Sequence, residues 1–125
     1  AHGQVAHRRE ARRVVTVERI ASLASEAARR LGELGYANVD FVTGDGTLGC
    51  PEHAPFDRIL SAAASPSVPS PWLEQLTEGG IVVLPVGGRF SQDLMRVTKR
   101  GGEQQIEFLG ACIFVPLIGR HGFPD

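Results

Sequence analysis

The stretch that most constrains the fold runs from residue 14 to residue 45 and predicts a strand, a helix and a second strand in succession. Val14–Val17 is β-branched throughout and has no polar face, which is typical of a strand buried on both sides of a parallel sheet. Apolar residues then recur at spacings of three and four and predict a helix over residues 19–34, with Gly35 at the usual place of a C-terminal glycine. Residues 38–42 predict the second strand. Such a unit has a right-handed crossover in nearly all proteins, so the sequence predicts an α/β fold.

The remainder of the chain predicts further strands and a change from parallel to antiparallel order. A proline-rich connection leads into a short helix that begins at Ser70-Pro71. The last two strands are joined by a hairpin-type connection, which is common at the end of a mixed sheet. The later strands are predicted at residues 56–60, 81–86, 91–98 and 104–115. Because 125 residues allow one domain, we expect residues 1–125 to form a single domain, with residues 1–13 as a poorly specified amino-terminal segment.

Composition argues against several classes of partner. A formal net charge of −1 and a pI near 6.5 argue against nucleic-acid or membrane partners that depend on bulk electrostatics. No run approaches the ~18 apolar residues that a membrane span needs. The two cysteines, Cys50 and Cys112, have neither a CxxC nor a cysteine–histidine ligand spacing. We therefore predict reduced thiols, no metal site and a cytoplasmic location.

Two acidic residues end consecutive predicted strands. Glu18 follows the first strand, and Asp45 follows the second within Gly44-Asp45-Gly46, where glycine permits positive φ or close backbone approach. Each has a structural alternative: a carboxylate at a helix N-terminus for Glu18, and a tight turn for the Gly-Asp-Gly motif. Together they favour a nucleoside-type ligand, because one strand-terminal carboxylate can accept hydrogen bonds from ribose hydroxyls and its neighbour from an exocyclic amine.

No residue pattern identifies a catalytic nucleophile, acid or base. The serines lack a nucleophile-elbow context, the four histidines are scattered, and a Walker phosphate loop is absent from the sequence. The strand predicted at residues 56–60 ends in the small residues Ser61–Ala64, which leave room for a ligand above the carboxyl end of a sheet. These patterns predict a binding site without naming a catalytic residue.

Five sequence blocks, taken together, resemble the protein-L-isoaspartate O-methyltransferases. They occur in that family's order and at its spacing, from about residue 14 to about residue 120. The blocks are Val14–Ile20, Gly44–Gly49, Ala54–Leu60 with Ala62–Ala64, Glu78–Gly87 and Phe114–Leu117. The resemblance implies a Rossmann-like, S-adenosylmethionine-dependent methyltransferase sheet with antiparallel carboxyl-terminal strands. It also implies methylation of the abnormal carboxylate of isoaspartyl residues in damaged proteins, which starts their repair.

The same resemblance implies roles for the residues at the strand ends. Glu18 would hold the ribose of the cofactor, with Arg19 beside it. The Gly-Asp-Gly motif would lie along the adenine, and the small residues 62–64 would floor the site near the methyl donor. The implied cofactor-binding residues are Glu18, Arg19, Gly44, Asp45, Gly46, Ala62 and Ala63. The reaction would be a direct displacement that depends on alignment of the two reactants, and no catalytic residue is implied.

One part of the family's pattern does not occur in this sequence. In the family, a strand and a glycine-rich loop that cradles the methionine part of the cofactor precede the strand that ends at the glutamate. We therefore expect a sheet that is incomplete at its amino-terminal side, between the strands ending at Glu18 and at Ala62. One functional hypothesis is an active methyltransferase, and the alternative is a catalytically silent fragment or degenerate methyltransferase domain with at most residual nucleoside binding. A further hypothesis is self-association that covers the open sheet edges.

Overall fold

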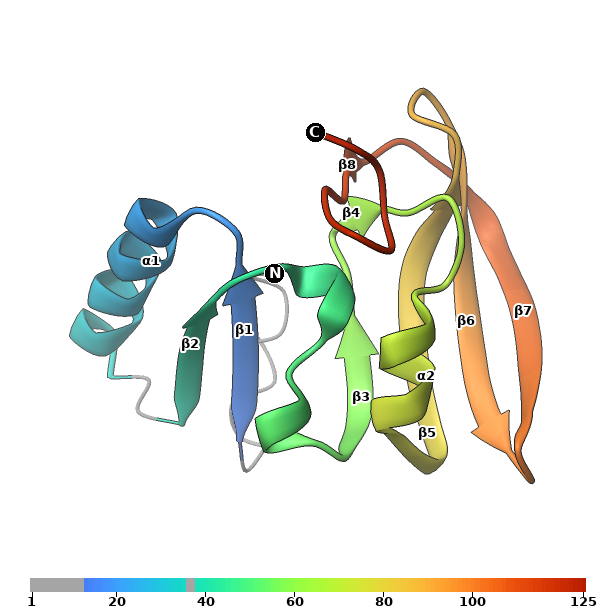
Figure 1. Cartoon of the computed structure of the whole chain (residues 1–125), viewed down its shortest axis with the longest axis horizontal. Coiled ribbons are helices and arrows are strands. Elements are labelled where there is room, and N and C mark those ends of the chain that lie inside the picture. Colours follow the sequence, from blue (N-terminus) through green and yellow to red (C-terminus); the bar gives the residue numbers. More distant parts are fainter. Residues whose placement is uncertain (1–12, 36–37) are drawn as a thin grey trace. The chain divides into compact units, whose positions relative to one another are not determined.

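A computed structural model describes residues 13–35 and 38–125 of the chain (Figure 1). The chain divides into two compact units, of which the first ends at Gly46 and the second runs from Thr47 to Asp125. The single domain expected from the length stays a prediction. The amino-terminal segment predicted to be poorly specified lies outside the described residues, apart from Arg13.

The first unit contains the predicted strand–helix–strand element. Its two strands pair in parallel, in register from Val14 opposite Val39 to Glu18 opposite Thr43. The helix packs against both strands. It begins two residues later than predicted, because Ile20 keeps an extended backbone conformation. The elements are β1 (Val14–Glu18), α1 (Ala21–Glu33) and β2 (Val39–Thr43).

Exposed ion pairs lie on the surface of this unit. Arg13 donates to the carboxylate of Asp40 in β2, with an Nε–Oδ2 distance of 2.7 Å, and this hydrogen bond raises the pKa of Arg13. On α1, Glu26 accepts hydrogen bonds from Arg29 at 2.6 Å and from Arg30 at 2.9 Å, which lowers the pKa of Glu26. Because these groups are exposed to solvent, the ion pairs contribute little to the stability of the fold.

The second unit is built on a four-stranded mixed sheet in the order β3–β5–β6–β7. β3 is parallel to β5, whereas β6 is antiparallel to both of its neighbours. A separate parallel pair joins β4 to β8. Short 3-10 turns at Gly46–Leu48 and Pro51–His53 precede the sheet. The elements are β3 (Phe56–Leu60), β4 (Ala63–Ala64), α2 (Ser70–Gln75), β5 (Leu76–Gly87), β6 (Gln92–Arg100), β7 (Glu103–Cys112) and β8 (Val115–Pro116).

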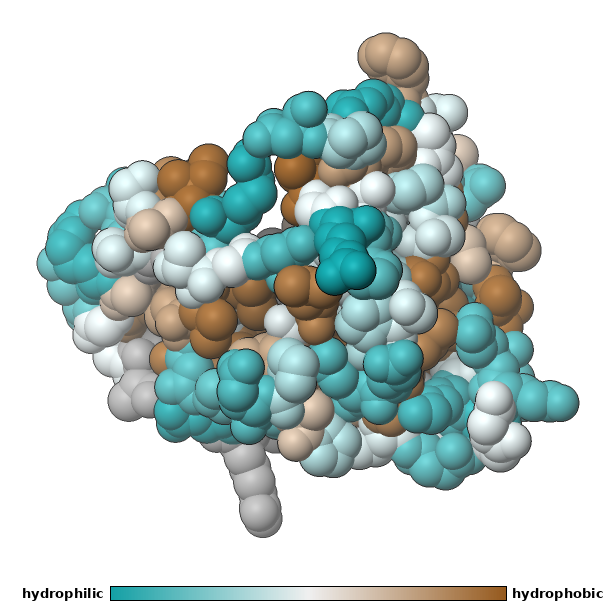
Figure 2. All heavy atoms as spheres, in the orientation of Figure 1, coloured by the Kyte–Doolittle hydropathy of each residue, from teal (hydrophilic) through white to brown (hydrophobic). Residues whose placement is uncertain are grey.

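The core of this unit lies between α2 and one face of β5 and β6. It consists of Trp72, Leu76, Val82, Leu84, Met95 and Val97. The edge strand β7 has no such cover, since all its residues from Glu103 to Ala111 are exposed, including Ile106 and Phe108. Apolar and polar residues are accordingly interspersed on the surface seen in Figure 2.

Several element boundaries differ from the predicted ones. β5 begins at Leu76 and runs through Gly79 and Gly80, whereas the sequence predicted its start at residue 81. The β6–β7 hairpin turns at Gly101 and Gly102, whose φ values of 59° and 77° are those that glycine adopts without strain. Among the described strands, β1 pairs with β2 in one sheet, and β3 belongs to another. No helix in residues 13–35 and 38–125 has the length and apolar character of a membrane span.

Candidate functional site

The carboxyl ends of β1 and β2 meet at one edge of the first unit. Glu18 lies opposite Thr43 in the parallel ladder, and the backbone N–H of Gly44 donates to the carbonyl of Glu18 at 2.9 Å. The Gly44-Asp45-Gly46 motif therefore leaves β2 directly beside the end of β1. Arg19 follows at the same edge and is exposed. The structure thus brings together five of the seven predicted site residues.

Glu18 is half-buried as a residue, and its carboxylate turns toward the start of α1. Its Oε1 accepts a hydrogen bond from the backbone N–H of Ile20 at 3.1 Å. This is the contact expected of a carboxylate near a helix N-terminus, the structural alternative to ligand binding. The two interpretations are compatible, because an ionised carboxylate has about four acceptor positions on its two oxygens. The contact with Ile20 fixes the side chain and leaves acceptor capacity for ligand hydroxyls.

The Gly-Asp-Gly motif does not adopt the positive-φ backbone that glycine permits. Neither Gly44 nor Gly46 has a positive φ, and Gly46 instead begins a 3-10 turn. Of the two reasons given for a glycine, positive φ therefore applies at neither position. A Cβ added at Gly44 would meet no atom within 4 Å, so this position borders open space. Close approach by a flat ligand is the remaining reason for a glycine there.

The other predicted residues lie in the second unit, where Ala62 precedes β4 and Ala63 begins it. Ala62 is exposed, Ala63 is half-buried and pairs with Val115, and Ala64 is fully buried. Ser61 fixes this short stretch, because its Oγ accepts from the N–H of Ala63 at 3.1 Å and donates to its carbonyl at 2.8 Å. The contribution of Ala62 and Ala63 to cofactor binding stays a prediction.

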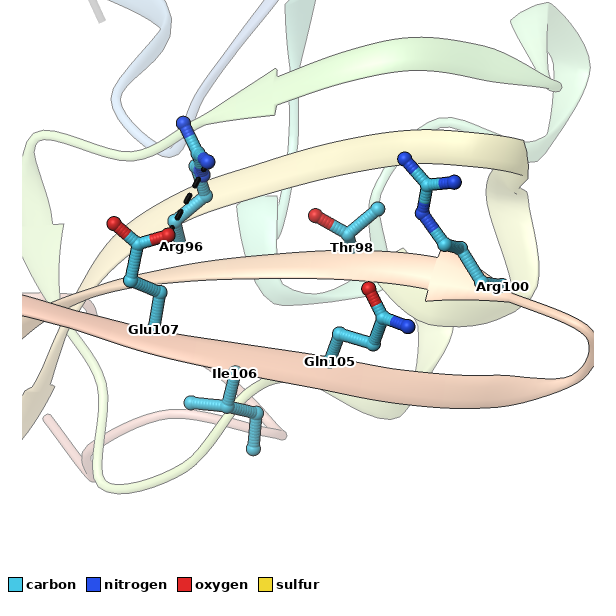
Figure 3. A pocket seen from close by; sticks show the side chains of 6 residues that line it. All are labelled: Arg96, Thr98, Arg100, Gln105, Ile106 and Glu107. Atoms are coloured by element: carbon cyan, nitrogen blue, oxygen red, sulfur yellow. Dashed lines mark hydrogen bonds and ion pairs between the residues drawn. The ribbon is translucent and has the colours of Figure 1, made fainter.

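A hollow of about 210 Å³ lies on the β6–β7 hairpin and contains none of the predicted residues. Its lining residues are Arg96, Thr98, Arg100, Gln105, Ile106 and Glu107 (Figure 3). Arg96 and Glu107 form an ion pair across it at 3.2 Å, and Ile106 points away from the other side chains. Small-molecule sites are mostly apolar clefts with a few polar groups, so we assign this open, polar surface no function.

Sequence reasoning missed one cluster of chemically active side chains. The thiol of Cys50 lies 3.2 Å from Nδ1 of His53 and 3.4 Å from Oε2 of Glu52. The available signal was a cysteine and a histidine three residues apart around a proline. That spacing brings two side chains together where the backbone forms a helical turn, here a 3-10 turn.

A parallel strand–helix–strand element, followed along the chain by a mixed sheet with an antiparallel edge, defines an α/β protein. The family model for protein-L-isoaspartate(D-aspartate) O-methyltransferase (PCMT) matches residues 4–122. The chain belongs to this family, as the sequence blocks predicted.

Two curated relatives carry the name protein-L-isoaspartate O-methyltransferase. The one from Dictyoglomus turgidum is 50% identical over 115 residues, which cover 92% of this chain and 52% of the relative. The one from Dictyoglomus thermophilum is 54% identical over 112 residues, which cover 90% of this chain and 51% of the relative. The chain thus spans about half the length of these curated relatives.

Solved structures confirm the predicted fold. A protein-L-isoaspartate O-methyltransferase superposes with a TM-score of 0.80 and 32% identity, over 88% of this chain and 35% of that chain. A beta-aspartate methyltransferase (PCMT) from Plasmodium falciparum, in complex with S-adenosyl-L-homocysteine, gives a TM-score of 0.73 at 22% identity. That match covers 85% of this chain and 52% of the other. The superposed part of each solved structure therefore shares the fold of this chain.

Proposed function

We propose that this chain transfers a methyl group from S-adenosylmethionine to the carboxylate of L-isoaspartyl residues in damaged proteins. The observation that carries the proposal is the edge of the β1–β2 pair, where Gly44 is hydrogen-bonded to the backbone of Glu18. This contact holds the Gly-Asp-Gly motif and a strand-terminal glutamate side by side. Membership of the family supplies the reaction, and the edge supplies acceptors suited to an adenosine group.

The residues at this edge fit the adenosine part of the cofactor. Glu18 accepts from the ribose hydroxyls, with Arg19 beside it, and Asp45 accepts from the exocyclic amine of adenine. Gly44 and Gly46 let the adenine approach the backbone, and the open space beside Gly44 supports this role. Ala62 and Ala63 remain cofactor-binding residues by prediction, since their small side chains would leave room near the methyl donor.

The reaction places modest demands on the side chains. When bound, S-adenosylmethionine supplies a methyl group on a sulfonium; transfer forms an O–CH3 bond to the substrate carboxylate while the S–CH3 bond breaks and its electron pair returns to sulfur. A carboxylate is already ionised at neutral pH, so no general base is needed to create the nucleophile. The chain's task is to hold two reactants in line.

Calorimetric titration with S-adenosylhomocysteine tests the binding residues. We expect Glu18→Gln and Asp45→Asn each to weaken binding by about 10- to 100-fold, the range for losing a charge-assisted hydrogen bond. The matched controls are Glu74→Gln and Asp93→Asn, which change exposed acids outside the proposed site. Equal affinity of all five proteins would contradict the roles given to the two carboxylates.

A methyl-transfer assay with an isoaspartyl peptide tests the activity. Methyl ester formation by the chain, absent with the matching aspartyl peptide, supports the proposed reaction. The alternative of a catalytically silent fragment or degenerate domain predicts no turnover and at most residual binding of S-adenosylhomocysteine. Absence of turnover would overturn the activity proposed for this chain, whereas the calorimetric titration decides on its binding residues.

Self-association and a cytoplasmic location stay predictions. The expectation concerns the sheet edges beside the strands that end at Glu18 and at Ala62. The edge strand β7, exposed from Glu103 to Ala111 with Ile106 and Phe108 on its surface, would offer a further edge for pairing. Sedimentation that shows only monomer at micromolar concentration would contradict it.

A further inference from the structure

Three possible metal ligands converge on the loop that precedes β3. Sγ of Cys50, a carboxylate oxygen of Glu52 and a ring nitrogen of His53 all lie within 4.8 Å of one another. The Sγ–Nδ1 distance is 3.2 Å and the Sγ–Oε2 distance is 3.4 Å. Cys50 is buried, whereas Glu52 and His53 are exposed, so the cluster has one inner donor and two outer donors.

The backbone of this segment is held in place by its own hydrogen bonds. Residues 51–53 form a 3-10 turn with Pro51 in its first turn, and the N–H of His53 donates to the carbonyl of Cys50 at 3.0 Å. In a 3-10 turn, side chains three residues apart lie over one another. Cys50 immediately precedes this turn, and the imidazole of His53 lies beside its thiol, with Nδ1 3.2 Å from Sγ.

A buried glutamine fixes the position of Cys50 from the other side. Oε1 of Gln75, in α2, accepts from the N–H of Cys50 at 2.9 Å, and its Nε2 donates to the carbonyl of Leu48 at 2.9 Å. Gly49 lies between them with φ of 66°, and a Cβ there would lie 2.2 Å from Oε1 of Gln75. Ligands held on a constrained backbone need little reorganisation to bind an ion.

The donor set and its spacing fit a tetrahedral Zn²⁺ site. The thiol of Cys50 lies within hydrogen-bond distance of both the carboxylate of Glu52 and the imidazole of His53, and a cation in place of the thiol proton would bond to all three groups. With Zn–S of about 2.3 Å and Zn–N or Zn–O of about 2.1 Å, the sulfur of a tetrahedral site lies roughly 3.6 Å from the other ligand atoms. The two observed distances are a few tenths of an ångström shorter, which a small rotation of exposed side chains corrects.

We propose that Cys50, Glu52 and His53 bind a divalent transition-metal ion of the Zn²⁺ type, with the fourth position open to water. The mixed sulfur, nitrogen and oxygen donors suit Zn²⁺ and Co²⁺ rather than Mg²⁺ or Ca²⁺, which prefer oxygen alone. The site departs from the sequence expectation of no metal, because that expectation did not include the 3-10 turn. It involves none of the proposed cofactor-binding residues and goes beyond the proposed methyl transfer.

Co²⁺ titration of the reduced, metal-free full chain tests the proposal. We expect one Co²⁺ per chain, visible bands of tetrahedral cobalt and a near-ultraviolet charge-transfer band from the thiolate, all removed by Zn²⁺. Cys50→Ser should abolish the charge-transfer band, whereas Cys112→Ser, the matched control at the other cysteine, should keep it. Binding should weaken as the pH falls, because protons compete for the thiol and the imidazole.

The exposed ligands give a second test that does not depend on a core substitution. His53→Gln and Glu52→Gln should each weaken Zn²⁺ binding by more than the roughly 10- to 100-fold typical of losing an outer-sphere partner, with an unchanged circular dichroism spectrum. Unchanged Zn²⁺ affinity in His53→Gln would overturn the proposal. So would a charge-transfer band that survives in Cys50→Ser, because the ion would then be bound elsewhere.

Discussion

The amide of Gln75 makes two hydrogen bonds that tie α2 to the loop at residues 48–50, and replacing it tests how the second unit positions this loop. Gln75→Leu keeps most of the side-chain volume and removes both hydrogen bonds. The N–H of Cys50 then loses its acceptor in a buried residue, and the carbonyl of Leu48 loses its donor. Glutamine at this position is a polar side chain with only 9% of its surface exposed.

The free energy of unfolding lost in Gln75→Leu depends on which of the two backbone groups can bond to water instead. A buried polar group that loses its hydrogen bond costs about 1–3 kcal/mol of unfolding free energy. Cys50 is only 3% exposed, so its N–H incurs that cost. Leu48 is 40% exposed, so we expect its carbonyl to bond to water in place of Gln75 and to add little to the cost. We therefore expect Gln75→Leu to lower the free energy of unfolding by about 2 kcal/mol, close to the value for one buried group.

Urea unfolding followed by the fluorescence of Trp72, the sole tryptophan of the chain, measures this difference. Trp72 belongs to the core of the second unit, so its signal reports on the unit that contains Gln75. The control is Gln105→Leu on the exposed strand β7, where we expect a change within about 0.5 kcal/mol. If both variants unfold with the same free energy as the unchanged chain, the amide of Gln75 does not hold the loop.

Three further predictions concern single contacts. Lys99→Met should cost about 1–2 kcal/mol in the same urea experiment, because Nζ of Lys99 donates to two carbonyls at the end of α2, at 2.9 and 3.0 Å; an unchanged midpoint would contradict this role. Gly49→Ala should destabilise the chain less in a Gln75→Ala background than in the unchanged chain, because Gln75→Ala removes the Oε1 atom that would lie 2.2 Å from the new Cβ. Strictly additive effects of the two substitutions would exclude this clash. The arginine partners of Glu26 lower its pKa, so their stabilisation is present above the ordinary carboxyl pKa of about 4.3 and is lost as the pH falls through the lower folded value. Glu26→Gln should therefore reduce the acid-side loss of α1 helicity in circular dichroism, and an identical pH profile would refute the contribution of these pairs.

The elements that could be predicted from sequence are those whose periodicity reflects a buried face. Val14–Val17 lies within β1, the helix predicted at 19–34 contains α1, and the strand predicted at 56–60 is β3. Errors concentrate at boundaries. Helical periodicity includes Arg19 and Ile20, but the carboxylate of Glu18 accepts from the N–H of Ile20 and the backbone there is still extended. The apolar pattern indicates which residues face the core, but it does not indicate at which residue the backbone hydrogen bonds of the helix begin.

Pairing with a partner strand extended β5 beyond its apolar run. Gly79 and Gly80 normally interrupt a strand, and the sequence pattern placed the start after them. In the structure, Leu76 pairs with Phe56 of β3, and the register shifts before Arg58 meets Ile81. The two glycines lie in that irregular stretch, where Gly79 has a φ of 79° and Gly80 lies against Leu76. The pairing of Leu76 with Phe56, twenty positions earlier, thus outweighed the local tendency of glycine to interrupt a strand.

The predictability of the two candidate sites differs for a related reason. The edge formed by Glu18 and Gly44 follows from the alternation of strand and helix alone, because parallel strands of one unit end at the same edge. The cluster at Cys50 depends on a 3-10 turn and on a hydrogen bond from Gln75, a residue 25 positions later. Residues at the spacing of Cys50, Glu52 and His53 also occur in many other loop conformations, in which the three side chains would lie apart. A site built on repetitive secondary structure can therefore be read from the sequence, whereas one built on a single irregular turn needs the coordinates of that turn.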